Sequence, residues 1–212
     1  MKNVVISLFD FTGKMVKPWL EAGFDCYIVD IQHQTSSNGK LHKINWDLTK
    51  PFVSPVEKNK IAFVSAFPPC DHLAVSGARW FKGKGLRKLA TSIEMFATAA
   101  ELCEWSEAPY LIENPVSTIS TYWRKPDYKF NPCDYTGFDS NDNYTKKTCL
   151  WVGNGFVMPE KNIALGLGKP DDRIHKCPHS NERHNIRSAT PKGFAKAVFL
   201  ANHAPIRQKL ET

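Results

Sequence analysis

The start of the chain constrains the fold most. An apolar run at 4–9, VVISLF, leads into an Asp-Phe-Thr-Gly turn and a helical pattern over 14–22 that ends at Gly23. A second apolar run at 25–30, DCYIVD, ends in an acid. The order strand, glycine turn, helix, strand, acid is that of a nucleotide-binding βαβ unit.

The same alternation continues to residue 113. Residues 60–67, KIAFVSAF, predict a buried strand, and residues 88–106 carry apolar side chains at helical spacing before a further strand at 109–113. Strands that alternate with helices predict an α/β fold, with a mostly parallel sheet and helices on both faces. A last helix is predicted over 191–202.

The remaining segments are less regular. Residues 31–43 and 71–87 are interpreted as loops, and a short strand is expected just before Asp47. Within an irregular region at 118–190, strands at 147–152 and 155–158 are expected to form a hairpin. A length of 212 residues suits a single domain over 1–212.

Composition narrows the class of protein. The net charge of +7 favours an acidic partner, of which nucleic acid is the commonest. The six cysteines show no paired spacing, which favours free thiols. The sequence has neither a long apolar run nor a secretion signal, so we expect no membrane segment and a cytoplasmic location.

Candidate ligand contacts fall where the predicted parallel strands end. Asp30 lies about 20 residues beyond Asp10, the spacing at which an acid accepts from ribose hydroxyls. Asp47 is a candidate acceptor for an adenine amino group, and Phe67 a candidate to lie against the adenine ring. The alternative is a tight turn followed by a solvated acid.

Cys70 and Glu113 are the candidate catalytic residues. Cys70 follows an apolar strand and two prolines, and a thiolate is a strong nucleophile. Glu113 ends the next strand and is a candidate acid. This pair suits attack of sulfur on C6 of cytosine while the carboxyl group protonates N3. The alternatives are a buried structural cysteine and a capping glutamate.

These motifs together resemble the DNA cytosine-5 methyltransferase family. SLFDFTGKMVKPWLEAGF at 7–24 is similar to its cofactor loop, and FPPCDHLAVSGAR at 67–79 to its nucleophile loop. VDI at 29–31 and WDL at 46–48 resemble its two cofactor-binding acids, and IENPVS at 112–117 resembles its Glu-Asn-Val motif. The chain looks closest to the short members carried by bacteriophages.

The resemblance implies a Rossmann-like methyltransferase fold that binds S-adenosyl-L-methionine and acts on DNA in a bacterial or phage-infected cell. It assigns catalysis to Cys70 and Glu113. The cofactor contacts it implies are Phe9, Asp10, Thr12, Gly13, Asp30, Ile31, Asp47, Leu48, Phe67, Pro68 and Asn202.

Nucleic-acid contacts are expected from basic and aromatic residues after Cys70 and from later arginines. These are Ser76, Arg79, Trp80, Lys82, Lys84, Arg124 and Arg187. Arg124 and the Lys146-Lys147-Thr148 segment are weak stand-ins for the family's arginine motif, which is absent. The large target-recognition domain is also absent, which predicts short or relaxed sequence specificity.

Two further departures leave alternatives open. Phe11 stands where the cofactor loop usually has glycine, and Asp71 replaces the glutamine after the nucleophile. The alternative functions are a related enzyme acting on RNA or a nucleotide, and a catalytically silent binding protein. His175, Cys177, His179 and His184 lie close together in the sequence, but their spacing matches no standard zinc pattern, so no metal is expected.

Overall fold

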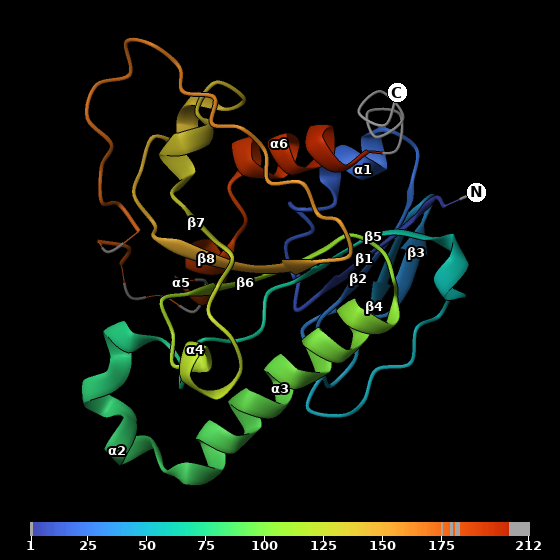
Figure 1. Cartoon of the computed structure of the whole chain (residues 1–212), viewed down its shortest axis with the longest axis horizontal. Helices are drawn as coiled ribbons and strands as arrows, with labels where there is room; N and C mark the ends of the chain where they lie inside the picture. Colours follow the sequence, from blue (N-terminus) through green and yellow to red (C-terminus); the bar gives the residue numbers. More distant parts are fainter. Residues whose placement is uncertain (1, 175, 179, 181–182, 204–212) are drawn as a thin grey trace.

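The computed structural model describes residues 2–174, 176–178, 180 and 183–203. It shows an α/β protein with one mixed, mostly parallel sheet of eight strands, in the order β3-β4-β2-β1-β5-β6-β8-β7 (Figure 1). The strands are β1 Val4–Leu8, β2 Asp25–Val29, β3 Ser36–Asn38, β4 Leu41–Ile44, β5 Ile61–Ala66, β6 Tyr110–Pro115, β7 Tyr128–Phe130 and β8 Thr148–Gly153. The α-helices are α1 Lys17–Glu21, α2 Phe81–Lys84, α3 Leu86–Trp105, α4 Ile119–Tyr122, α5 Arg183–Ser188 and α6 Lys192–Asn202.

The centre of the sheet is parallel. Strands β4, β2, β1, β5 and β6 pair in parallel, whereas β3, β8 and β7 join through antiparallel pairs. All five residues of β1 are buried, as expected of a strand covered on both faces. The chain moves from β1 outward to β2 and β4, then returns to β5 on the other side of β1. The strand order therefore reverses between β1 and β5, and ligands of such sheets bind at this position.

Two apolar clusters hold the helices to opposite faces of the sheet. Helix α3 covers one face, where Phe96 and Leu102 pack with residues of β1, β5 and β6. Helices α1 and α6 cover the other face, where Trp19 stacks on Phe63 with ring centroids 5.0 Å apart. Figure 1 shows the sheet nearly edge-on between these layers. Among the described residues, no helix is long and apolar enough to cross a membrane.

Three details differ from the sequence predictions. Residues 71–87, interpreted as a loop, contain a 3-10 helix at Val75–Trp80 and helix α2, and no apolar periodicity marks them because neither helix has a buried residue. Residues 155–158 form no strand, and β8 pairs instead with β6 and β7 in the interior of the sheet. The 31–43 segment holds the β3–β4 hairpin, so the strand before Asp47 lies earlier than expected, at Leu41–Ile44. Both strands are short, β3 is exposed and β4 is only partly buried, and their sequences therefore lack the apolar pattern of a buried strand.

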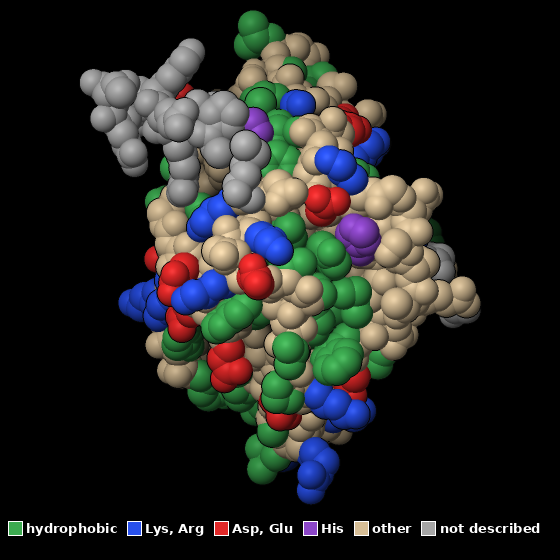
Figure 2. Space-filling view, turned by 90° about the vertical axis from the view of Figure 1, so that its right-hand side faces the viewer, with side chains coloured by type: hydrophobic (Ala, Val, Ile, Leu, Met, Phe, Trp, Pro, Cys, Tyr) green, Lys and Arg blue, Asp and Glu red, His purple; other side chains and the backbone are tan. Residues whose placement is uncertain are grey.

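The side of the molecule that carries β3 and β4 has a mixed surface. Figure 2 shows hydrophobic side chains in its lower half, with Lys, Arg, Asp and Glu interspersed around them. The positive charge of the chain is therefore not gathered on this side.

Candidate active site

Backbone hydrogen bonds within the loop that carries Cys70 fix the conformation of that loop. After β5 the chain passes through two prolines to Cys70, whose carbonyl accepts from the N–H groups of Leu73 at 3.0 Å and Ala74 at 2.8 Å. The side chain of Leu73 is fully buried in the cluster beneath α3. This anchor fixes the loop at the carboxyl end of β5, next to the strand-order reversal.

A second set of hydrogen bonds joins this loop to the end of β6. The Asn114 side chain donates from Nδ2 to the Pro68 carbonyl at 2.8 Å. The Val75 N–H donates to the Val116 carbonyl, and the Thr118 N–H to the Leu73 carbonyl, both at 2.9 Å. The segments that follow Cys70 and Glu113 are therefore held side by side.

Glu113 lies within β6, opposite Leu150 of β8. Only 13% of its side chain is exposed, and Oε1 has no hydrogen-bond partner in the described part of the chain. The Lys146 ammonium lies 4.0 Å from this oxygen and is itself largely buried. Burial raises the pKa of the Glu113 carboxyl, and Lys146 opposes this shift.

Cys70 and Glu113 interact electrostatically. The pKa of the Cys70 thiol is raised to about 11, chiefly by burial and also by the charges of Asp71 and Glu113, while Lys146 opposes the shift. Glu113 also contributes to the raised pKa of the Tyr144 hydroxyl, after burial and Asp142. The thiol, the carboxyl and the ammonium therefore belong to one site, in which the resting cysteine is protonated at neutral pH.

The segment after Glu113 contains further polar atoms without partners. Three buried oxygens, Asn114 Oδ1, Ser117 Oγ and Thr118 Oγ1, make no hydrogen bond in the described part of the chain. Buried polar atoms are usually paired, so such a run of orphan oxygens is typical of a surface that receives a polar ligand.

The β1–α1 loop is organised by Asp10. Its buried carboxyl accepts from the Ser7 hydroxyl at 2.8 Å, the Gly13 N–H at 2.7 Å and the Thr12 hydroxyl at 3.3 Å. Burial nevertheless raises the pKa of Asp10. Gly13 has a φ of 65°, and Phe9 adopts the left-handed region with a φ of 55°. The Asp10 carboxyl thus holds the loop together, which leaves backbone and exposed side chains for ligand contact.

The two predicted acids lie at the ends of neighbouring strands. Asp30 follows β2. Its Oδ1 accepts from the backbone N–H of Gln32 at 2.8 Å and also from the Gln32 side-chain amide, whereas its Oδ2 accepts from neither. The next residue, Ile31, is 62% exposed. Beyond β4, Asp47 accepts from the Thr49 N–H at 3.0 Å and hydroxyl at 2.7 Å, and these bonds lower its pKa.

Four predicted cofactor residues have structural roles. Leu48 is buried in the cluster beneath α3, and Phe67 packs against the cluster beneath α1 and α6. Pro68 is buried and its carbonyl is used by Asn114. The expectation for Asn202 is not supported, because its amide exchanges hydrogen bonds of 2.9 Å with the backbone of Val157. It ends α6, which lies beside α1 on one face of the sheet (Figure 1).

The expected nucleic-acid residues separate into two groups. Ser76, Arg79, Trp80 and Lys82 are exposed after Cys70, and the Arg79 guanidinium lies 5.0 Å from the Trp80 ring centre. Lys84 is half-buried and donates from Nζ to the Asp71 carbonyl.

The later arginines are elsewhere. Arg124 pairs with Asp127 at 2.5 Å and donates to the Val152 carbonyl at 2.9 Å, near the start of β6, so its expected role beside the substrate is not supported. Arg187 is exposed on α5. That helix contacts the loop after β2, since Asn185 hydrogen-bonds Gln32.

The structure adds Asn114 to the site and places Lys146, a weak candidate in the sequence, beside Glu113. The β6–β8 pairing is antiparallel, so residues just before β8 lie beside the carboxyl end of β6. Only the basic pair at 146–147 signalled this in the sequence. His175 and His179 lie outside the described residues, as does the side chain of His184. The described residues hold no group of three or more metal-ligating side chains.

Comparisons with known proteins add no relative. No family model matches the chain, and no curated protein matches it significantly.

Proposed function

We propose that this chain is an S-adenosyl-L-methionine-dependent methyltransferase that modifies C5 of cytosine in DNA through a covalent Cys70 adduct. One observation carries the proposal: hydrogen bonds from Asn114 to Pro68 and between the following segments hold the Cys70 loop beside the carboxyl end of the strand that carries the buried Glu113. The sheet supports it, because the order β4-β2-β1-β5-β6 is the 3-2-1-4-5 order of nucleotide-binding folds.

The residues divide the reaction between them. The Cys70 sulfur forms a bond to C6 of the cytosine, while Glu113 places a proton on N3, so that C5 becomes nucleophilic. Burial raises the pKa of the Glu113 carboxyl, which is the direction that favours a proton donor. Once C5 carries the methyl group, a base removes the C5 proton. The Cys70–C6 bond then breaks and returns the thiolate, while the N3 proton goes back to Glu113.

Lys146 affects the ionisation of both catalytic groups in this scheme. Its ammonium lowers the pKa of the Cys70 thiol and that of the Glu113 carboxyl. With a thiol pKa of about 11, only about one thiol in a thousand is ionised at pH 8. Transfer of the thiol proton is therefore a substantial part of the barrier. Protonation of Glu113 lowers this part of the barrier, because a neutral carboxyl group does not repel the thiolate.

The cofactor residues fit a nucleoside with a positively charged sulfonium. S-adenosyl-L-methionine would supply the methyl group when bound. The backbone of Phe9–Gly13 would approach it closely, and Asp30 has an oxygen outside its bonds with Gln32 for a ribose hydroxyl. Ile31 offers an exposed apolar surface for the adenine ring, and Asp47 an acceptor for its amino group.

Transfer of a labelled methyl group tests the activity. The chain is incubated with labelled S-adenosyl-L-methionine and with single-stranded DNA, duplex DNA, RNA or free cytosine nucleotides, and the product is hydrolysed to nucleosides. The proposal predicts 5-methylcytosine from DNA. Label found only in RNA, only in nucleotides or nowhere contradicts it. Cys133→Ser serves as a control for Cys70→Ser, because Cys133 is also a partly buried free thiol.

A further inference from the structure

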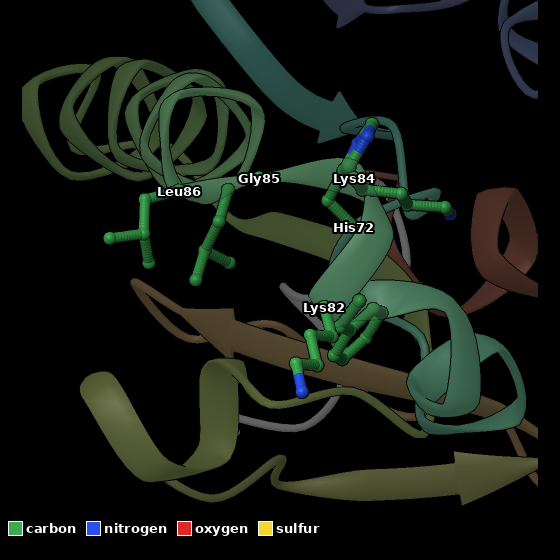
Figure 3. Close-up of a pocket in the computed structure, with 7 residues that line it drawn as sticks. His72, Lys82, Lys84, Gly85 and Leu86 are labelled. Carbon is green, nitrogen blue, oxygen red and sulfur yellow. The ribbon is translucent and has the colours of Figure 1, made fainter.

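A cleft of about 380 Å³ opens beside the Cys70 loop, between α2 and the start of α3 (Figure 3). Phe81, Leu86 and Leu89 give it apolar walls. Figure 3 shows the side chain of Leu86 on the side of α3 and that of Lys82 across from it. The volume lies at the small end of the range for ligand pockets, which suits one flat aromatic group.

The rim of this cleft is positively charged. Lys82 and Lys84 line it, and no acidic side chain does. Three further exposed basic residues lie close by in the sequence, namely Arg79, Arg87 and Lys88. An apolar slot with a cationic rim is complementary to a nucleobase and its flanking phosphates.

The cleft is joined to the catalytic loop. Lys84 donates to the carbonyl of Asp71, which directly follows Cys70. His72 lines the cleft, and its Nδ1 lies 3.3 Å from the hydroxyl of Ser92, a buried residue of α3. The wall of the cleft therefore begins within two residues of Cys70, a span of roughly 7 Å at most.

From this arrangement we infer that the cleft binds an unpaired nucleobase adjacent to the reacting cytosine, and that the substrate is single-stranded DNA. The inference rests on the proposed function. In a duplex the bases flanking an extruded cytosine stay paired and stacked, so they cannot enter a side cleft. In a single strand the base next to the cytosine rotates out of the stack freely and stacks on Phe81. Lys82 and Lys84 then contact the phosphates on either side of it.

Binding measurements test this without any methyl transfer. Fluorescence anisotropy compares a labelled single-stranded 12-mer that holds one cytosine with the same 12-mer in a duplex. We expect tighter binding of the single strand, and Phe81→Ala to weaken it roughly tenfold. Lys82→Ala should lower the salt dependence by about one unit of slope. Lys17→Ala, which removes an exposed lysine from α1 on the other face, should change neither.

Abasic nucleotides locate the base in the cleft. An abasic site on one side of the cytosine should weaken binding by wild type but not by Phe81→Ala, since that variant has already lost the stacking surface. The inference is overturned if the duplex binds equally well, or if wild type is insensitive to abasic sites on both sides of the cytosine. Methyl transfer to DNA with no effect of Phe81→Ala would overturn it and leave the proposed function standing. Cleft-dependent binding without methyl transfer would support the cleft and contradict the function.

Discussion

Asn114 donates from its side-chain amide to the carbonyl of Pro68 at 2.8 Å, and so ties the strand that carries Glu113 to the loop that carries Cys70. Both residues are buried, so water does not replace this bond. Together with two backbone hydrogen bonds between the following segments, this amide fixes the position of the Cys70 loop relative to β6.

We predict that Asn114→Leu lowers both stability and activity. A lost buried hydrogen bond that leaves the Pro68 carbonyl unpaired costs about 1–3 kcal/mol in the free energy of unfolding. The value of kcat/KM should fall by more than the folded fraction explains, because the Cys70 loop loses its register. Urea unfolding and initial rates measure the two effects. Asn59→Leu, at an exposed position, is the control. Full activity in folded Asn114→Leu would contradict this role.

Lys146→Met should lower kcat/KM by roughly tenfold to a hundredfold near pH 7.5. The lysine lowers the pKa of both the Cys70 thiol and the Glu113 carboxyl, so its loss raises both. The ascending limb of the pH–rate profile, which follows thiolate formation, should then move to higher pH. Lys146→Arg should restore most of the activity. The exposed neighbour variant Lys147→Met should have an unchanged profile, and a Lys146→Met profile that overlaps wild type would refute the assignment.

The pH dependence of stability tests the burial of Asp10. Burial raises its folded-state pKa above the ordinary value of 3.8, so the folded state binds this proton more tightly than the unfolded chain. The resulting stabilisation is fully present below pH 3.8 and is lost as the pH rises through the folded pKa. Asp10→Asn cannot ionise, so its stability relative to wild type should improve from pH 4 to pH 7. Glu101→Gln, at an exposed position, should show no such trend.

Asn202→Leu separates a structural role from a cofactor role. The amide bonds to the backbone of Val157, so its loss should lower the free energy of unfolding by about 1–3 kcal/mol. Binding of S-adenosyl-L-methionine by the folded variant should be unchanged in calorimetry. A selective loss of cofactor affinity with normal stability would restore the interpretation made from the sequence.

The sequence predicted the central sheet well because its strands are buried. Residues 4–8 and 61–66 carry continuous apolar runs, and turns with glycine or proline mark their ends. It did not predict the β3–β4 hairpin, whose strands are short and exposed or only partly buried. The position of β8 in the sheet was also not predicted, because a six-residue apolar run indicates neither which strands it pairs with nor in which direction it runs.

The candidate site was likewise predicted only in part from the sequence. Cys70 and Glu113 stand at strand ends, where topology alone brings residues together. Lys146 reaches Glu113 only because β8 runs antiparallel to β6, and no local pattern encodes that pairing. Arg124 looked equally suitable in the sequence, but Asp127 and the Val152 carbonyl hold it near the other end of β6.

Covalent trapping on DNA that contains 5-fluorocytosine tests the central claim most directly, because fluorine at C5 blocks the final elimination. With S-adenosyl-L-methionine present, wild type should form a cross-link that peptide mass spectrometry locates at Cys70. Cys70→Ala should form none, and Glu113→Gln should form it at least tenfold more slowly. A cross-link at another residue, or an undiminished rate in Glu113→Gln, would contradict the claim that this thiol and this carboxyl act on one pyrimidine ring.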